Sequence, residues 1–600
     1  MRRTNSPLYG WNAPLNISTY GLLGAFLCGS AIALTLATAL LTLLWGPPAG
    51  TPIVDPGQSR LAGLVGIALM GGLMMKPRWR APAASGMAVL LVVALVPLHS
   101  PVVFMRTLTR VLRSGSTQQI TAVASCLVAG AVLTGALAHT LLSFLRLRAS
   151  AVRGSTHWGN AAALQAAAQG LLVGMAKGSL LRYNGDGHLL TVAATRSGKG
   201  VSSIIPNLLN HAGSLVVTDP KGENYYVTEG YRRKTLGQEV VALDPFSITP
   251  AAPCGFNPMD LLNLESDDFA ESAMSMADMI IPRSRSSGES HWTLEGKALL
   301  YTFILHAASS EDPQRRNLIE VRRLLTLRPE KLNKVLEEML KSSVEQVAEG
   351  AGRILQKSDR ERSGVFSTAQ SHTHFLANPR MRRVLTQTGF ELDKLTQDRL
   401  SLYLILPRQH LTAFAPWLRL MVSCCYYVCT HNVLNRGRSR ERILFMLDEF
   451  ANLGYMSNIK EAVSLGGGYG VTMWLILQDM AQLKREYREE WESFVANSDV
   501  IQLFAIQDPF TAGKVAQMLG QTTVWQRRTR KASRREGGHL LRDFDEGSRP
   551  LLRPEELRRL HPDRQLLLVR PYQPVVADKI RYYRDRFFLG RFARNPYIVV

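Results

Sequence analysis

Hydrophobic positions in the first 150 residues fall in long runs that contain few charges. Tyr20–Trp45 is long enough to cross a bilayer, and Gly86–Leu98 and Ile120–Leu145 are further candidate spans. Leu61–Met75 is shorter and would need tilt, neighbouring helices or a re-entrant path. The basic flanks fit four spans with both termini in the cytoplasm, whereas the arginines between 106 and 113 keep a two-span alternative open. We therefore predict a transmembrane region over residues 1–150.

Beyond residue 150 the apolar runs become short and alternate with helical patterns. Such runs are typical of strands buried on both faces, and this alternation predicts a parallel sheet covered by helices. Tyr226–Leu236 is the expected crossover helix between two of these strands, and Pro574–Asp585 is expected to form a final strand and helix. The predicted strands are the run that starts at Leu189, Ser214–Asp219, Val240–Asp244, Ser401–Leu406, Ile443–Leu447, Val471–Leu477 and Val500–Ala505.

Strand-like runs disappear between about residue 261 and residue 395, where apolar positions recur with helical spacing. One such stripe has charged residues on its other face and consists of Leu332, Val335, Leu336, Met339 and Leu340. The pattern predicts an all-α domain, 261–395, inserted into an α/β domain made of residues 151–260 and 396–600.

A phosphate-binding loop is predicted where the first of these strands turns into a helix. Small residues allow backbone N–H groups to converge on an anion at the helix N-terminus, and Lys199 adds a positive charge. The match to the usual motif is imperfect, since Ala193 replaces its first glycine and Gly200 its hydroxyl residue. An ordinary strand–helix turn is the alternative. The candidate nucleotide-binding residues are Thr195, Arg196, Ser197, Gly198, Lys199, Gly200, Val201 and Ser202.

Two carboxylates follow a second buried strand and complete the expected site. In the run ILFMLDEF, Asp448 is placed to hold Mg²⁺ and Glu449 to activate a water for attack on a γ-phosphate. Gln478 ends another strand, where it can respond to the γ-phosphate or the attacking water. A solvated loop start for the acids and a surface position for Gln478 are the alternatives.

Composition suggests an anionic partner. The formal charge is +22, and Gln526–Arg535 (QRRTRKASRR) forms a basic run able to follow phosphates without reading sequence. A solvated hairpin, or a loop that faces anionic lipid, explains the same run.

Several segments, in one order from about Arg153 to Arg584, resemble the coupling proteins of type IV secretion and conjugation systems (TraG-type). They are RGSTHWGNA, HLLTVAATRSGKGVSSIIPNLL, GSLVVTDPKGENYYVTEGYRR, FNPMD, ERSGVFSTA, LFMLDEFANLG, LQDMAQL and RPLLRPEEL. The resemblance covers the membrane region poorly, because the family commonly has two N-terminal spans.

The resemblance implies a RecA-like nucleotide-binding domain with an inserted all-α domain, assembled as a hexamer at the inner membrane. It implies ATP and Mg²⁺ as cofactors, with Ser202 supplying the hydroxyl for magnesium that Gly200 cannot. A neighbouring subunit would supply an arginine finger, for which the sequence offers Arg362, Arg408 and Arg419 without choosing among them.

Residues and resemblance together favour a multi-pass inner-membrane ATPase with its C-terminal domain in the cytoplasm. It would recruit a relaxase–DNA substrate and deliver it to the other subunits of a secretion channel. Lys199, Glu449 and Gln478 are the expected catalytic residues, and Asp448 and Ser202 the expected metal ligands. A pump for protein effectors and a non-hydrolysing docking receptor are the alternatives.

Overall fold

The computed structural model describes residue 113 and residues 154–597, except 283–289, 398, 437–440 and 532–539. The chain divides into two compact units, Met1–Ser150 and Ala151–Val600. The predicted membrane spans, and the choice between two and four of them, lie outside the described residues. The second unit is described below.

An 11-stranded sheet forms the centre of the second unit, in the order β2-β1-β13-β12-β9-β3-β8-β7-β4-β6-β5. The strands from β9 to β5 are parallel. They are β9 (Ser498–Phe504), β3 (His188–Ala193), β8 (Val471–Leu477), β7 (Ile443–Leu447), β4 (Leu215–Asp219), β6 (Leu400–Ile405) and β5 (Glu239–Leu243). All the strands predicted from apolar runs are therefore confirmed, with ends that differ by one or two residues.

Antiparallel strands extend this sheet beyond β9, and the sequence analysis identified only one of them. They are β12 (Arg564–Val569), β13 (Val575–Asp578), β1 (Leu171–Ala176) and β2 (Ser179–Tyr183). The expected final helix is wrong: after β13 the described chain forms turns and a short 3-10 helix, Arg586–Phe588. This segment packs against the rest of the unit, since Tyr582 and Phe588 are buried in a small cluster with Leu172, Ile205, Leu209 and Val227.

Both faces of the parallel strands are buried, which explains why their sequences are mostly apolar, and that of β7 (ILFML) entirely so. In β7, Phe445 belongs to the larger core cluster, and its neighbours Leu444 and Met446 belong to the second one. The helix after β4 is α8 (Glu223–Lys234), which begins three residues earlier than predicted, behind Gly222 at φ 70°.

Helix α16 (Leu411–Arg436) belongs to the larger cluster. Within the part of the chain that the structure describes, Arg408–His431 is the one helical segment with the length and hydropathy of a membrane span. Since 67% of its apolar window is buried inside the protein, it is a core helix by position.

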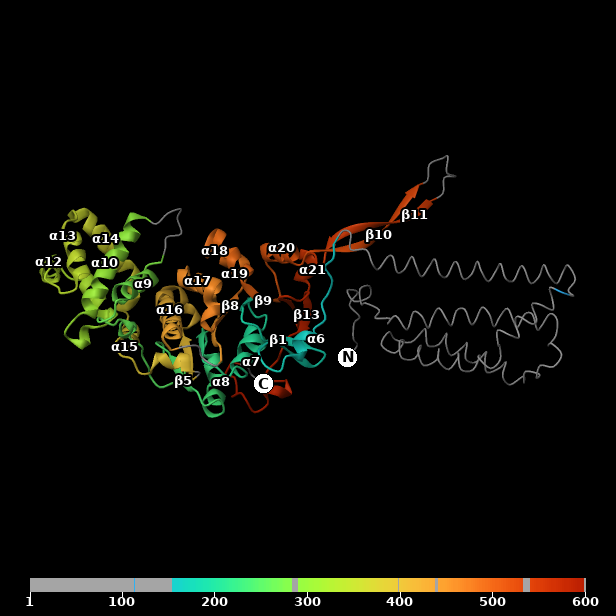
Figure 1. The fold of residues 1–600 in the computed structure, drawn as a ribbon, viewed down its shortest axis with the longest axis horizontal. Helices are drawn as coiled ribbons and strands as arrows, with labels where there is room; N and C mark the ends of the chain where they lie inside the picture. The colour runs from blue at the N-terminus through green and yellow to red at the C-terminus, as the bar shows by residue number, and fades with distance from the viewer. Residues whose placement is uncertain are drawn as a thin grey trace. The chain divides into compact units, whose positions relative to one another are not determined.

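The described residues between β5 and β6 form helices and no strand (Figure 1). The longer helices are α9 (Phe269–Ile280), α10 (His291–Ala308), α11 (Leu318–Leu325), α12 (Pro329–Met339), α13 (Glu345–Leu355), α14 (Asp359–His372) and α15 (Pro379–Leu385). In the predicted stripe, Leu332, Leu336 and Met339 are buried. The helical region shares its core cluster with one face of the sheet, so its status as a separate domain stays a prediction.

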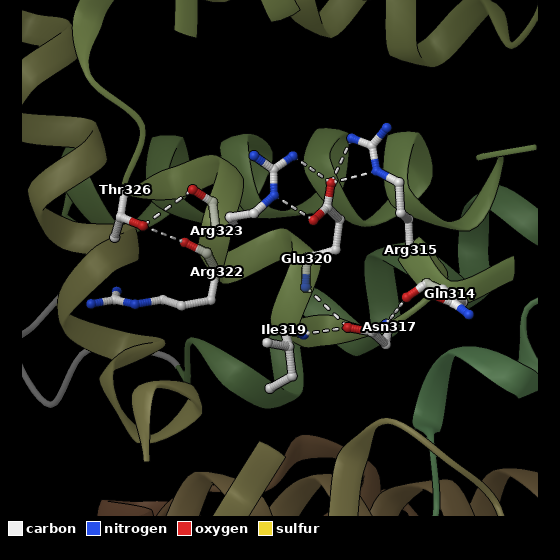
Figure 2. Close-up of polar contacts among 8 residues, drawn as sticks. All are labelled: Gln314, Arg315, Asn317, Ile319, Glu320, Arg322, Arg323 and Thr326. Carbon is white, nitrogen blue, oxygen red and sulfur yellow. Dashed lines mark hydrogen bonds and ion pairs between the residues drawn. The ribbon is translucent and has the colours of Figure 1, made fainter. Parts of the chain in front are cut away.

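A polar cluster fixes the start of α11 (Figure 2). The Asn317 side chain accepts hydrogen bonds from the N–H groups of Ile319 and Glu320 and thus caps the helix. Glu320, only 9% exposed, pairs with Arg315 and Arg323 at 2.6 Å each. The cluster joins α11 to the preceding loop, so it has a structural role.

Most of the basic run is strand rather than loop. Strand β10 (Gln521–Lys531) pairs antiparallel with β11 (Leu540–Pro550) into a hairpin that extends from the sheet domain (Figure 1). Residues 532–535 of the run lie outside the described residues.

Candidate nucleotide-binding site

The topology brings the predicted site residues to one edge of the sheet. In the sheet order, β8 lies between β3 and β7, and the three strands are parallel. Their carboxyl ends therefore meet at the same edge. The loop from Ala194 to Lys199 leaves β3, Asp448 and Glu449 leave β7, and Gln478 leaves β8.

The loop after β3 has the backbone of a tight anion-binding turn. Arg196 has φ 63° and Gly198 has φ 91°, both in the left-handed region. The turn is closed by a hydrogen bond from the Ser197 N–H to the Ala194 carbonyl, at 3.1 Å. A helical segment begins at Gly200, first with π-helical pairing over Gly200–Ile204 and then as α7 (Ile205–Leu208). The predicted strand–loop–helix context is present.

Lys199 is the centre of the site's charges. Its ammonium lies 2.7 Å from Asp448 Oδ1 and 2.8 Å from Glu449 Oε1, so the two motifs, 250 residues apart, are in direct contact. The three side chains are only 18%, 11% and 8% exposed. In direct contact, one ammonium thus serves two carboxylates, and the next cation is the guanidinium of Arg408, 3.8 Å from Glu449.

Gln478 links the acidic pair to the phosphate loop. Its amide nitrogen donates to Glu449 Oε2 at 2.7 Å, and its amide oxygen accepts a hydrogen bond from Thr195 Oγ1 at 3.3 Å. A displacement of Thr195 is thus transmitted to Glu449, or the reverse, through the Gln478 side chain.

Backbone geometry also holds the acids in place. Glu449 has φ 56° and ψ 37°, a left-handed conformation that costs a non-glycine residue about 1 kcal/mol or more and is concentrated at functional sites. The backbone carbonyl of Asp448 accepts a hydrogen bond from Thr218 Oγ1 at 2.9 Å, which ties the end of β7 to β4.

Burial and pairing give the two carboxylates different acidities. Burial raises the pKa of Asp448, and Lys199 offsets this only in part. For Glu449, burial is outweighed by Lys199 and Gln478, which lower its pKa. Burial disfavours the Lys199 ammonium, but Asp448 and Glu449 together raise its pKa. Glu449 is therefore the more firmly ionised member of the pair.

The candidate arginine fingers occupy different environments. Arg419 is 7% exposed and donates to the backbone carbonyls of Leu453 and Met279 within the same chain, so it is committed to the fold. Arg362 pairs with Asp359 on α14. Arg408 is half exposed, and its guanidinium lies 3.8 Å from Glu449 Oε1, a contact that the sequence analysis did not predict.

Asp219 is another carboxylate at this edge that the sequence analysis left without a role. It ends β4, is 2% exposed, and accepts hydrogen bonds from the N–H groups of Lys221 and Tyr225. Burial raises its pKa to about 7. The available signal was its place at the end of the run SLVVTD, because it follows a parallel strand just as Asp448 does.

A covered parallel sheet, an anion-binding loop after one strand and an acidic pair after a nearby strand define the class as P-loop nucleotide-binding proteins. A model of the family described as type IV secretory system conjugative DNA transfer matches residues 152–597. The chain belongs to this family, as the sequence motifs indicated.

Relatives and solved structures agree with this assignment. The conjugal transfer protein TraG of Escherichia coli is 29% identical over 446 residues, which cover 69% of this chain and 70% of TraG. Protein VirD4 of Agrobacterium fabrum is 26% identical over 420 residues, 69% of this chain and 61% of VirD4. The plasmid coupling protein TrwB, solved with the ATP analogue ADPNP, aligns with a TM-score of 0.55 and 16% identity over 72% of this chain and 95% of TrwB. This structural likeness shows a shared α/β fold.

Proposed function

We propose that this protein is a Mg²⁺-dependent ATPase of the inner membrane that couples ATP hydrolysis to the transfer of a DNA–protein substrate into a type IV secretion channel. The contact of Lys199 with Asp448 and Glu449, with Gln478 beside them, is the observation that carries the proposal. Solved structures of TrwB in complex with ADPNP and with ADP and Mg²⁺ support the choice of ligands.

The donor set at the sheet edge fits ATP and Mg²⁺. Phosphate oxygens need cations and N–H donors, which Lys199 and the loop from Thr195 to Ser202 provide. Mg²⁺ prefers oxygen ligands, and the Asp448 carboxylate and the Ser202 hydroxyl are assigned to it. When bound, Mg²⁺ would place positive charge on the phosphates, and ATP would supply the phosphoanhydride bond that is hydrolysed.

The side chains then divide the work. Lys199 holds the phosphates, and to do so it exchanges its carboxylate contacts for phosphate contacts. Glu449, ionised and fixed by its backbone, accepts the proton of the attacking water. Gln478 keeps Glu449 in place and, through Thr195, reports a change at the loop.

Membership of the family supports our choice of substrate and assembly. DNA with a relaxase-type protein, a homo-hexamer, other subunits of the channel and the lipid bilayer are the partners we propose. The chain's +22 charge favours an anionic substrate. In a ring, Arg408 or Arg362 of a neighbour would face the nucleotide, whereas Arg419 is used within its own subunit.

ATP hydrolysis by the full-length protein in detergent, with and without DNA, tests the proposal. Lys199→Ala should abolish turnover, and Lys341→Ala, a matched change at an exposed lysine beyond α12, should not. DNA-stimulated turnover supports the nucleic-acid motor. Turnover indifferent to DNA favours protein effectors, and ATP binding without turnover favours the docking receptor.

A further inference from the structure

A lysine far along the chain reaches the phosphate loop. Strand β13 is antiparallel to β12, which is antiparallel to β9, so β13 runs in the same direction as β9 and β3. Its carboxyl end therefore lies at the same edge of the sheet as the phosphate loop. Lys579 is the first residue after β13.

The Lys579 ammonium is held by two contacts at this edge. It donates a hydrogen bond to the backbone carbonyl of Ser197 at 2.8 Å, and it lies 4.6 Å from the centre of the Phe504 ring at the end of β9. Its own backbone N–H donates to the Asp563 carbonyl. Among the described residues, Lys579 forms no ion pair. Its charge is therefore not cancelled by a carboxylate in contact.

The carbonyl bond fixes the orientation of a donor in the loop. In a trans peptide the C=O and N–H groups point in opposite directions. When the Ser197 carbonyl faces Lys579, the N–H of Gly198 must face the other way. Gly198, at φ 91°, has no side chain whose packing could fix the plane of the Ser197–Gly198 peptide. The hydrogen bond from Lys579 supplies that constraint.

A second group of the same residue is left for a ligand. The Ser197 hydroxyl is buried and has no hydrogen-bond partner among the described residues. A buried hydroxyl without a partner is costly, and a phosphate oxygen would satisfy it. The hydroxyl and the carbonyl of Ser197 thus both indicate an anion at this turn, the hydroxyl directly and the carbonyl through its bond from Lys579.

We propose that Lys579 is a positioning residue of the phosphate site, which holds the Ser197–Gly198 peptide in its anion-binding orientation and adds positive charge next to the loop. The charge matters because Lys199 is already shared by two carboxylates in this state. The inference rests on the proposed function, since it assigns Lys579 to the binding of the same nucleotide.

The protonation of Lys579 gives the test a second readout. Burial lowers the pKa of Lys579 to about 8; nearby Arg581 lowers it further and Asp563 raises it. The ammonium is present at pH 7 and is lost as the pH rises past 8. An arginine in its place keeps its charge over this range.

The experiment compares Lys579→Met and Lys579→Arg in the full-length protein, with Lys341→Met as the matched control. We expect Lys579→Met to raise the KM for ATP about tenfold with kcat nearly unchanged, because a charge-assisted contact that orients the loop is lost. Lys579→Arg should restore most of the affinity. The KM of the wild type should rise between pH 7 and pH 9, and those of both variants should stay flat.

A fall in thermal stability would separate a structural role from a positioning one. The lowered pKa means that the folded state holds this proton less well than the unfolded state, so at pH 7 removal of the charge should leave the midpoint equal or higher. Should Lys579→Met unfold, Lys579→Gln replaces it. An unchanged KM, or an arginine variant no better than the methionine variant, would overturn the inference. If the wild type binds ATP without hydrolysing it, the proposed ATPase fails, and the Kd for ATP still decides the role of Lys579.

Discussion

Two clusters of charged residues in this protein contain buried carboxylates and have opposite charge balances. At the start of α11, one carboxylate, Glu320, is shared by the guanidinium groups of Arg315 and Arg323 (Figure 2). At the carboxyl edge of the sheet, Asp448 and Glu449 share the ammonium of Lys199 at contact distance, and the Arg408 guanidinium lies farther off, 3.8 Å from Glu449. The helical cluster is oversupplied with positive charge, and the sheet edge is undersupplied.

The difference separates a cluster that stabilises the fold from one prepared for a ligand. The acid in the helical cluster has a helical backbone, a capped helix and full pairing, so nothing further is needed. The sheet edge combines a left-handed Glu449, an excess of carboxylates and Asp219, which forms no ion pair among the described residues. A bound metal ion would offset that imbalance.

The largest effect on turnover is expected at Glu449, the carboxylate that we assign to proton transfer. Glu449→Gln is expected to lower ATP turnover by about a hundredfold or more, because the proton acceptor is lost. ATP affinity should be retained, and the thermal midpoint should fall slightly, because the pairing with Lys199 that lowers the pKa of Glu449 also stabilises its ionised form in the folded state. Turnover assays, nucleotide titration and thermal unfolding of the same preparation measure all three. Retained turnover would assign the proton transfer elsewhere.

For the cluster at the start of α11 we expect a loss of stability without a loss of turnover. Glu320→Ala should lower the free energy of unfolding by about 1–2 kcal/mol, because two half-exposed guanidinium groups lose their shared partner. Turnover per folded molecule should be unchanged. Urea unfolding and ATPase assays below the unfolding midpoint test this, with Glu337→Ala on the exposed face of α12 as the control. A loss of turnover without a loss of stability would give the cluster a functional role.

The two regions should also respond to pH with opposite sign. Burial raises the pKa of Asp219 to about 7, so its contribution to stability is lost as the pH rises from about 4 towards 7. Burial acts on Glu320 in the same direction, but Arg323 and Arg315 outweigh it and lower its pKa. Its contribution is complete above its unfolded value and is lost as the pH falls through the folded value.

Urea midpoints over a pH series measure this contrast. Relative to the wild type, Asp219→Asn should gain stability as the pH rises from 4 to 8. Glu320→Gln should lose stability over the acidic part of the range and then stay constant. Equal slopes for the two variants would mean that their charge environments are alike.

Much of the sheet and its site was predictable, because the strands and the functional residues that follow them form recognisable local sequence patterns. The runs that end at Ala193, Leu447 and Leu477 are mostly apolar, and polar groups follow each within two residues. Because the three strands are parallel neighbours, Lys199, Asp448 and Gln478 meet at one edge. Strands β1, β2 and β12 contain a glycine or an arginine among their apolar residues (LLVGMA, SLLRY, RQLLLV) and pair antiparallel at the far end of the sheet. Contacts that depend on folded geometry, such as Arg408 with Glu449, leave no local pattern.

Substitution of Arg408 should have the smallest effect on turnover. It tests whether the edge of the sheet has too little positive charge for its carboxylates. Its guanidinium is 54% exposed and lies 3.8 Å from Glu449, beyond hydrogen-bond range, so within one subunit the pair is worth about 0.2–1 kcal/mol. Arg408→Gln is therefore expected to change turnover by no more than about fivefold, with a weaker effect at high salt because the contact is screened. Arg408→Lys should keep nearly the turnover of the wild type if charge alone matters. A loss of about a thousandfold would contradict this estimate and identify Arg408 as the residue that acts on a neighbour's nucleotide, since only a transition-state contact is worth that much.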